Sequence, residues 1–475
     1  MSTEKLSVKY WVLVLALVLV LPLTILFVYQ KQSNTKMSDA VIPKITDQPK
    51  ETLVASGVLP LHQWKTQNDV PVYFVPTETL PILDIDVSFD AGSARDAQEQ
   101  AGLAYLTMKI LNQGTQNLQA DPDAVALGFE NVGAILDADI DKDKASIRLR
   151  SLSQIKQLND TISLFADVIA EPVFSDESFA RVKEKAKVQL SRGLQDPGFV
   201  ASRAFYEQVY GEHPYAHAVL GTEETIEAIT KEKIIDFHKK YYVASNAHIT
   251  IVGGIHRNKA KEIAEVIAKQ LEKGEKPQPI AKVKEIEEKL KAKEVKFPSQ
   301  QSHVLMGQPG RIVGDDKLFP LLVGNHILGS GGFTSRLFKE VRKENGLAYS
   351  VYSYFYPLKE LGPFMISLQT QGEQTGEALN IAKSTLVSFL QEGPSDEELM
   401  LAKQHLIGAF AHKFDSNRKL LNVVSDQAFY GLPSDFFDTY NEAIEKVTRD
   451  DIIESFKSRL DPEHMALVVV GEQTS

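Results

Sequence analysis

Apolar and polar residues alternate strictly in one segment of the chain, between positions 83 and 89. The apolar positions are Leu83, Ile85, Val87 and Phe89, and the polar positions between them are Asp84, Asp86 and Ser88. Because successive side chains of a strand point to opposite faces, this alternation predicts a half-buried β-strand. Residues 176–194 instead show helical periodicity, which ends before Pro197, where a helix cannot continue. Mixed patterns of this kind predict an α+β fold in which helices cover antiparallel-rich sheets.

The hydrophobic pattern also repeats along the chain. Ile226 aligns with Ile444, and the alignment continues without a gap until Gly253 meets Gly471. Each copy has the pattern of a helix, a short loop and a buried strand that ends at glycine. The repeat therefore predicts two homologous halves.

Between the halves lies a segment that is rich in charge and contains two prolines. Residues 274–298 include Pro277 and Pro279, followed by a run in which most residues are Lys or Glu. This composition favours a solvated linker. We therefore expect an N-terminal domain at residues 58–273, a charged linker at 274–298 and a C-terminal domain at 299–475.

Near the N-terminus, residues 10–29 are uncharged and mostly apolar. About 20 such residues suffice to span a bilayer, so the pattern predicts a transmembrane helix. The predicted order is a cytoplasmic N-terminus at residues 1–9, an anchor at 10–29 and a polar tether at 30–57. Lys5 and Lys9 precede the apolar stretch, which favours export of the body by the positive-inside rule. A cleaved signal peptide is the alternative, but no small-residue cleavage site follows the stretch.

Composition narrows the possible functions. A chain of 475 residues exceeds what one hydrophobic core normally supports, in agreement with two domains. The formal net charge of −11 argues against nucleic-acid binding, which needs clustered Lys and Arg. The chain has no Cys, and this excludes disulfides, thiolate metal ligands and a Cys nucleophile.

The segment 102–115, GLAYLTMKILNQGT, resembles the motif-bearing helix of the pitrilysin/insulinase-type zinc peptidases. In that family H-x-x-E-H supplies two zinc ligands and the catalytic glutamate. The corresponding positions here are Tyr105, Met108 and Lys109. A thioether and an ammonium cannot replace a general base and a histidine ligand. The family's further glutamate ligand falls near residues 185–190, which contain no acid. The resemblance therefore implies a degenerate motif and no metal or cofactor bound by this chain.

A second element of the family is retained. Residues 342–349 resemble its R-x6-Y element, with Arg342 and Tyr349 at the two ends. The resemblance implies that this pair grips a substrate carbonyl and stabilises the oxyanion, since both groups donate hydrogen bonds to developing negative charge. The alternative is that Arg342 is a solvated cation at a helix end and Tyr349 a core aromatic residue.

A glycine-rich segment precedes that element: Gly329, Gly331, Gly332 and Phe333. The resemblance implies a substrate-binding loop beside the cavity. A helix start capped by Thr334 or Ser335 is the alternative. Nucleotide binding is excluded, because no Lys or acid stands at the spacing of the phosphate-binding motifs.

Taken together, these features resemble the non-catalytic subunit of a heteromeric zinc metallopeptidase of the bacterial two-chain type. The expected partner is a homologous subunit with an intact H-x-x-E-H motif and its own zinc, and the expected ligand is a peptide. The expected location is the inner membrane, by a single-pass anchor, with the body in the periplasm. A catalytically inert scaffold or peptide-binding protein is the alternative. Arg342 and Tyr349 favour the first interpretation.

Overall fold

The computed structural model describes residues 59–472, apart from residues 79, 119–120, 285, 287 and 289. The predicted cytoplasmic segment, membrane anchor and tether, residues 1–57, lie outside the described residues. Between residues 59 and 472, no helix is both long enough and apolar enough to cross a bilayer. The predicted single-pass location in the inner membrane, with a periplasmic body, is contradicted by this finding.

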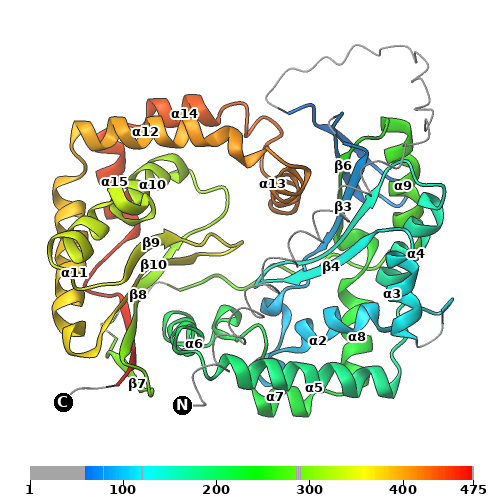
Figure 1. Cartoon of the computed structure of the whole chain (residues 1–475), viewed down its shortest axis with the longest axis horizontal. Coiled ribbons are helices and arrows are strands. Elements are labelled where there is room, and N and C mark those ends of the chain that lie inside the picture. Colours follow the sequence, from blue (N-terminus) through cyan, green and yellow to red (C-terminus); the bar gives the residue numbers. More distant parts are fainter. Residues whose placement is uncertain are drawn as a thin grey trace, which may run out of the picture. The chain divides into compact units, whose positions relative to one another are not determined.

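The first sheet has six strands in the described part of the chain, in the order β1-β2-β6-β3-β5-β4. All neighbouring pairs are antiparallel except β2 and β6. The strands are β1 (His62–Lys65), β2 (Pro71–Pro76), β3 (Ile82–Phe89), β4 (Ile135–Ile140), β5 (Ala145–Leu152) and β6 (Ala247–Gly253). The helices of this half of the chain are α2 (Leu103–Ile110), α3 (Pro122–Glu130), α4 (Leu158–Ala170), α5 (Asp176–Gly193), α6 (Pro197–Tyr210), α7 (Glu223–Ala228), α8 (Lys231–Tyr241) and α9 (Arg257–Gln270) (Figure 1).

The second sheet has five strands among the described residues, in the order β7-β11-β8-β10-β9. Here the parallel pair is β7 and β11. The strands are β7 (Lys293–Lys296), β8 (Gln301–Arg311), β9 (Ser350–Phe355), β10 (Gly362–Gln371) and β11 (Ala466–Gly471). The helices of this half of the chain are α10 (Leu318–Asn325), α11 (Thr375–Glu392), α12 (Asp396–Phe410), α13 (Asn417–Tyr430), α14 (Tyr440–Lys446) and α15 (Arg449–Arg459), with π-helical segments at His326–Ser330 and Phe338–Glu344.

The α+β architecture with two antiparallel-rich sheets agrees with the prediction, and the internal repeat is confirmed. Helices α8 and α15 occupy aligned positions, and each begins after a threonine whose hydroxyl accepts a backbone N–H: Thr230 and Thr448. Strands β6 and β11 also align, and each lies between an antiparallel and a parallel neighbour. The equivalent elements therefore have the same topology in both halves.

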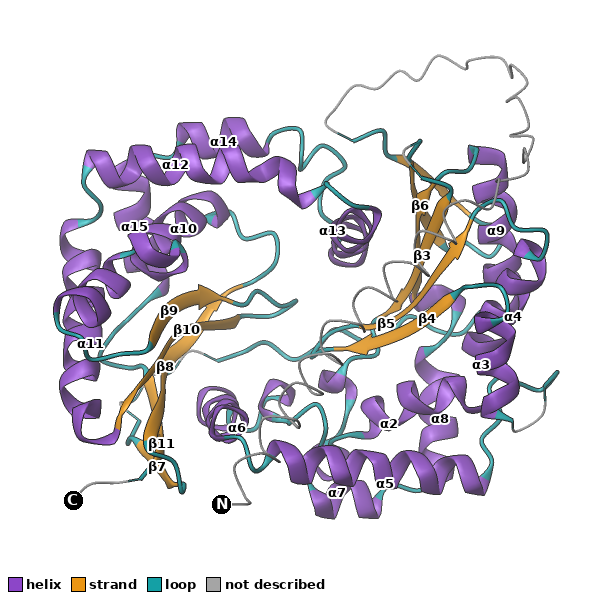
Figure 2. Ribbon diagram, in the orientation of Figure 1, coloured by secondary structure: helices purple, strands orange, loops and turns teal. Residues whose placement is uncertain are grey.

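Two helices pack across the boundary between the halves. Helix α6 precedes the predicted linker but packs on β8 and β11 of the second sheet, whereas α13 packs on β3 and β6 of the first (Figure 2). A shared apolar cluster includes Phe205 of α6 together with Leu305 and Val468 of the second sheet. Leu420 and Val424 of α13 pack on Val75 and Val252 of the first sheet. Each half thus contributes one helix to the core of the other.

This exchange corrects the prediction that the strand at residues 83–89 is half-buried. Asp84 and Asp86 are 1% and 0% exposed, so both faces of β3 are covered. Asp84 pairs with Arg150 at 2.7 Å, and Asp86 accepts a hydrogen bond from Ser425 of α13 at 2.6 Å. Buried carboxylates need such partners, and they are supplied by β5 and α13.

The predicted solvated linker is wrong at its C-terminal end. Residues Lys293–Lys296 form β7, which pairs with β11, so the second sheet begins before residue 299. Val283, Leu290 and Phe297 are partly buried against the cluster that contains Phe205. The prediction was based on the many Lys and Glu residues of this segment, and it overlooked these apolar residues. The remaining predicted domain boundaries stay predictions.

Candidate functional site

The degenerate motif lies on α2, whose start is set by a buried carboxylate. Asp96 accepts hydrogen bonds from the backbone N–H groups of Gly102 and Ala104, each at 2.8 Å. These N–H groups have no partner within the helix, so the carboxylate fixes where α2 begins. Gly102 has φ +98°, and a Cβ at this position would lie 3.0 Å from the carbonyl oxygen of Leu220, so glycine is favoured there. Burial raises the pKa of Asp96 to about 8, although these two N–H groups act in the opposite direction.

Tyr105 and Gln189 occupy the space where the resemblance implies metal ligands. The Tyr105 hydroxyl donates a hydrogen bond to Gln189 Oε1 of α5 at 2.6 Å. Burial of the phenol raises its pKa, which keeps the hydroxyl protonated and a donor. The predicted acid-free stretch of α5 is thus joined to the degenerate motif by a neutral hydrogen bond.

Met108 and Lys109 complete the motif without providing metal ligands. Met108 is 2% exposed and packs in the core. The Lys109 ammonium donates to the carbonyl oxygen of Ala138 on β4 at 3.3 Å, and it lies 5.5 Å from the Tyr105 ring centroid. A zinc ion needs lone pairs from His, Cys, Asp or Glu. Among the described residues no three such side chains are grouped, so α2 and its surroundings do not fit zinc.

A cavity of about 190 Å³ opens between α2 and β4. Its lining combines apolar side chains with an ammonium, a carboxylate and an amide: Met108, Lys109, Leu111, Asn112, Leu136, Asp137, Ala138, Ile147 and Val168. The Asp137 carboxylate pairs with Arg418 of α13 at 2.9 Å. Strand β4 is an edge strand, since β5 is its neighbour on one side and no described strand pairs with the other. The cavity therefore adjoins a sheet edge that can accept an added strand.

The structure places Arg342 and Tyr349 on either side of a helix end. Arg342 lies in the π-helical segment Phe338–Glu344, and its guanidinium stacks on the Phe338 ring at 5.1 Å from the centroid. Gly346 has φ +66°, and its N–H donates to the Arg342 carbonyl at 3.0 Å, which caps the C-terminal end of this segment. Tyr349 precedes β9 and is 52% exposed. Its hydroxyl accepts a hydrogen bond from Gln371 Nε2 at 3.3 Å.

Two glycines of the glycine-rich loop, Gly329 and Gly331, are required by close packing. A Cβ at Gly329 would lie 2.3 Å from Ser353 Oγ of β9. A Cβ at Gly331 would lie 2.4 Å from the carbonyl oxygen of His326. Ser335 stands at the predicted helix start, since its backbone is extended and its carbonyl accepts from the Lys339 N–H at 3.1 Å. Its hydroxyl and that of Thr334 donate to loop carbonyls, however, and cap no N–H group.

Phe333 is the residue of this loop that is open to solvent. It is 77% exposed, and its ring packs edge-on against Phe338 at 5.0 Å between centroids. Phe338 also lies under the Arg342 guanidinium. Phe333 and Arg342, both predicted site residues, thus contact the same Phe338 ring. Gly332 has φ +62°, and a Cβ there would meet nothing within 4 Å.

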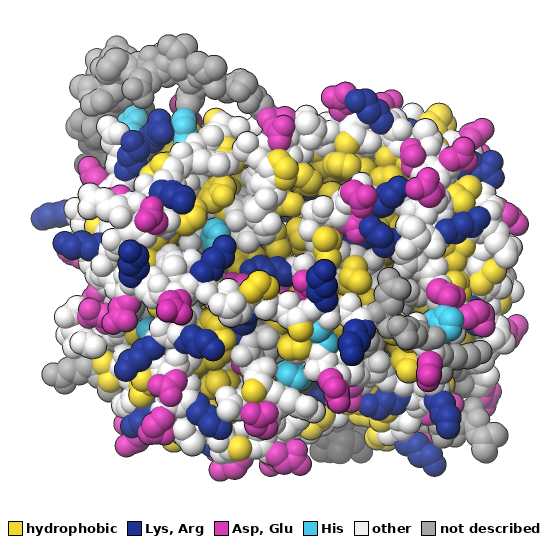
Figure 3. All heavy atoms as spheres, turned by 180° about the vertical axis from the view of Figure 1, so that it is seen from behind, with side chains coloured by type: hydrophobic (Ala, Val, Ile, Leu, Met, Phe, Trp, Pro, Cys, Tyr) yellow, Lys and Arg dark blue, Asp and Glu magenta, His cyan; other side chains and the backbone are white. Residues whose placement is uncertain are grey.

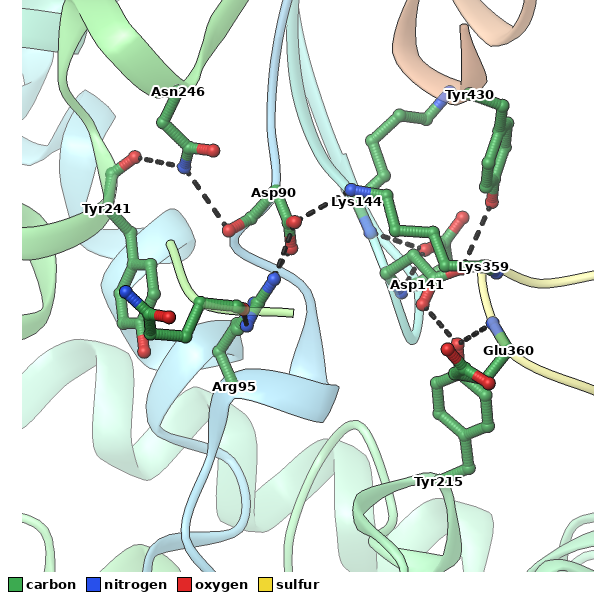
Figure 4. Close-up of polar contacts among 12 residues, drawn as sticks. Asp90, Arg95, Asp141, Lys144, Tyr215, Tyr241, Asn246, Lys359, Glu360 and Tyr430 are labelled. Atoms are coloured by element: carbon green, nitrogen blue, oxygen red, sulfur yellow. Dashed lines mark hydrogen bonds and ion pairs between the residues drawn. The ribbon is translucent and has the colours of Figure 1, made fainter. Parts of the chain in front are cut away.

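The β4–β5 hairpin at residues 141–144 was missed in the sequence. The backbone N–H groups of Asp143 and Lys144 donate to Asp141 Oδ1 at 2.8 and 2.7 Å, and this closes the turn. Asp143 is 0% exposed and accepts hydrogen bonds from the Tyr215 hydroxyl at 2.7 Å and the Lys359 N–H at 2.7 Å. The Tyr215 hydroxyl also accepts a hydrogen bond from the Glu360 N–H at 3.1 Å (Figure 4). A run of four charged residues between two strands is typical of a solvated turn, so no signal marked it as buried.

Burial changes the protonation of this hairpin. It raises the pKa of Asp141 to about 6 and lowers the pKa of Lys142 to about 7. The Lys142 ammonium donates to the carbonyl of His217 and lies 4.7 Å from the Tyr206 ring centroid. The hairpin connects the two halves, because Lys359 belongs to the second half and its ammonium also pairs with Asp90 of the first at 2.7 Å.

Acidic and basic side chains are interspersed on the face of the molecule that is opposite to the view of Figure 1 (Figure 3). This distribution agrees with the net charge of −11 and differs from the basic stripe of nucleic-acid-binding proteins.

Two family models match the chain. The insulinase family, peptidase family M16, matches residues 76–223, and the peptidase M16 inactive domain matches residues 228–406. A crystal structure of a peptidase M16 inactive domain from Pseudomonas fluorescens is 34% identical, with a TM-score of 0.83, and covers 87% of this chain and 98% of that chain.

Curated relatives show the same likeness over most of their length. The "non-peptidase homolog YmxG" of Helicobacter pylori is 25% identical over 418 residues, which are 87% of this chain and 94% of that protein. The "uncharacterized zinc protease YmxG" of Bacillus subtilis is 24% identical over 362 residues, 76% of this chain and 86% of that protein. This chain is therefore a homologue of inactive peptidase-like proteins.

Proposed function

Because the chain belongs to the insulinase family, peptidase family M16, we propose that it is the non-catalytic, substrate-binding subunit of a heteromeric zinc metallopeptidase. Its partner is a homologous subunit with an intact H-x-x-E-H motif, and its ligand is an extended peptide. The observation that carries the proposal is the hydrogen bond between Tyr105 and Gln189, which fills the space of the metal ligands while the surrounding fold is kept.

The edge strand β4 supports the peptide-binding part of the proposal. Its outer side is unpaired among the described strands, and an extended peptide can add to such an edge by main-chain hydrogen bonds. The cavity beside Ala138 then accepts one of the peptide's side chains. Such binding needs no catalytic residue of this chain.

Arg342 and Tyr349 support the assisting role. Both side chains are exposed, so a partner subunit can reach them. A guanidinium is charged at every physiological pH, and a phenol is a neutral donor. Both stabilise an oxyanion that forms when a water molecule attacks a peptide carbonyl at the partner's site.

Arg342→Ala and Tyr349→Phe should each reduce peptide hydrolysis by the two-chain complex. Loss of one oxyanion donor typically lowers turnover about 100- to 1,000-fold. The assay is co-purification with the motif-bearing partner, followed by cleavage of a fluorogenic peptide. Matched controls are Lys343→Ala on the same segment and Tyr352→Phe on β9, which should retain wild-type turnover.

A purely scaffolding role is the second candidate. One observation favours it: in the described structure no hydrogen bond or ring contact joins Arg342 to Tyr349, since each has its own neighbour. If both Arg342→Ala and Tyr349→Phe complexes assemble and retain wild-type turnover, this scaffolding role replaces the assisting one.

We also propose that the zinc belongs to the partner alone. Elemental analysis of the purified, dialysed chain should find far less than one zinc per chain, because Tyr105, Met108 and Lys109 do not provide a ligand set. About one tightly held zinc per chain would contradict this assignment.

A further inference from the structure

We infer that the cavity between α2 and β4 binds a carboxylate of an extended peptide, and that Lys109 is the cation that receives it. The inference rests on the proposed peptide-binding function and adds to it the chemical class of the ligand. It gives Lys109, which stands at the position of a lost zinc ligand, a role in peptide binding.

Lys109 is a partly buried cation without a carboxylate partner. Other partly buried lysines of this chain are paired: Lys144 with Asp426, Lys183 with Glu227 and Lys359 with Asp90. Among the described residues, no ion pair involves Lys109, and the Ala138 carbonyl takes one of its three donors. A cation that is already partly desolvated gains more from an anion than a cation in water does.

The cavity offers room and complementary surfaces. Its volume of about 190 Å³ is several times the share of one water molecule, about 30 Å³. Leu136 is partly exposed and offers apolar surface for the stem of a side chain, Ile147 and Val168 are buried in the lining, and Lys109 lies at the wall. The carboxylate of Asp137 does not neutralise Lys109, because it pairs with Arg418 at 2.9 Å.

The position of Lys109 beside the sheet edge favours a peptide over a small anion. Its ammonium donates to the backbone of β4 at Ala138, so it already lies beside the edge strand. Three successive β4 residues, at positions 136–138, also line the cavity. An extended peptide added to β4 therefore passes the cavity, and every second side chain points to the same face of the sheet.

The last turn of α2 provides another reason for a cation, because the helix dipole favours positive charge there. A lysine that points into solvent would be enough to stabilise the helix dipole. Lys109 instead contacts β4 and lines the cavity. The two explanations predict different results in a binding experiment, since a dipole effect does not depend on the peptide.

Three fluorescent probe peptides test the inference on the full chain. Each is an extended sequence of alternating threonine and valine: one has a central glutamate and blocked ends, one has glutamine in its place, and one has glutamine with a free C-terminal carboxylate. Fluorescence anisotropy should show that at least one carboxylate-bearing peptide binds about tenfold more tightly than the blocked glutamine peptide. This preference reflects a charge-assisted hydrogen bond.

The variants assign the preference to Lys109. Lys109→Met should abolish the preference, and Lys109→Arg should retain it. Lys269→Met, at an exposed lysine of α9, is the matched control and should behave as wild type. Which peptide gains affinity shows whether the carboxylate comes from a side chain or from a C-terminus.

Two outcomes overturn the inference in different ways. If all three peptides bind equally, or if Lys109→Met keeps the preference, the carboxylate site is wrong but peptide binding stands. If no peptide binds to the chain, peptide binding itself fails, and the proposed function fails with it.

Discussion

At the scale of single residues, a buried histidine makes stability depend on pH. His238 lies between Phe174 and Tyr242, and its Nε2–H donates to the Ile169 carbonyl at 2.8 Å. Burial lowers its pKa to about 4, with a smaller contribution from Lys239 and an opposing one from the Ile169 carbonyl. In the unfolded chain the same group titrates near 6.5. The neutral imidazole is therefore the form that the fold stabilises.

The free energy of unfolding should fall between pH 6.5 and pH 4. Above 6.5 both states hold a neutral imidazole and the contribution is complete, but below 6.5 the unfolded chain binds a proton that the folded chain resists. The loss at one such site is at most about 3 kcal/mol. Denaturant unfolding at several pH values measures how steeply the free energy of unfolding depends on pH. In His238→Gln this slope should correspond to about one proton fewer taken up on unfolding.

His412→Gln is the control for this measurement, because His412 is exposed. It should leave the slope unchanged. An unchanged slope in His238→Gln would show that His238 does not cause the pH dependence.

The degenerate motif could be predicted from the sequence, but its contacts could not. The residues that flank the motif in the segment 102–115 align it with the family without any structure. They identify the three altered positions as Tyr105, Met108 and Lys109. The bond from Tyr105 to Gln189 joins residues that are far apart in the chain, and no periodicity reports such a pair. The same limit applies to Asp84 and Asp86, whose polar character predicts solvent although both are buried, the first paired with Arg150 of β5 and the second accepting from Ser425 of α13.

At the scale of elements, one glycine sets the distance between the loop before Arg342 and strand β9. A Cβ at Gly329 would lie 2.3 Å from Ser353 Oγ and 2.4 Å from its backbone nitrogen. The nitrogen belongs to a paired strand and cannot move freely. Ser353 is distant from Gly329 in the sequence. The sequence alone therefore does not show whether Gly329 is needed for packing or for the close approach of a ligand.

Gly329→Ala should therefore destabilise the protein, by about 1–3 kcal/mol, as overpacking of a core does. The control is Gly376→Ala near the start of α11, where a Cβ meets nothing within 4 Å. That variant should gain about 0.4–1 kcal/mol, because alanine restricts the unfolded chain. Denaturant unfolding of the two variants decides the matter, and equal stability of both would contradict the packing role of Gly329.

At the scale of the whole folded body, the halves depend on each other. Helix α6 packs on the second sheet and α13 on the first, while the hairpin at residues 141–144 receives donors from both halves. The two halves could be predicted from the repeat. Their exchange of helices could not, because an amphipathic helix does not specify which sheet covers its apolar face.

The hairpin contact can be tested at Asp143. Its carboxylate accepts from the Tyr215 hydroxyl, the Lys359 N–H and, at 3.4 Å, the Tyr430 hydroxyl. Asp143→Asn replaces one acceptor oxygen by an NH₂ group that faces these donors. The free energy of unfolding should fall by about 1–3 kcal/mol, the cost of leaving a buried donor unpaired. Hydrogen exchange at the Lys359 amide should become faster, because this N–H loses its acceptor.

Asp426→Asn provides the comparison, because Asp426 pairs with Lys144 but its side chain is more than half exposed. Its partner Lys144 is buried, with a side chain that is 8% exposed, so this variant should also lose stability by leaving that ammonium unpaired. It should leave hydrogen exchange at the Lys359 amide unchanged, because Asp426 does not contact that N–H. Since Lys359 and Asp143 belong to different halves, faster exchange in Asp143→Asn alone would mean that the hairpin holds the halves together. Equal exchange in both variants would mean that the exchanged helices hold the halves together without the hairpin.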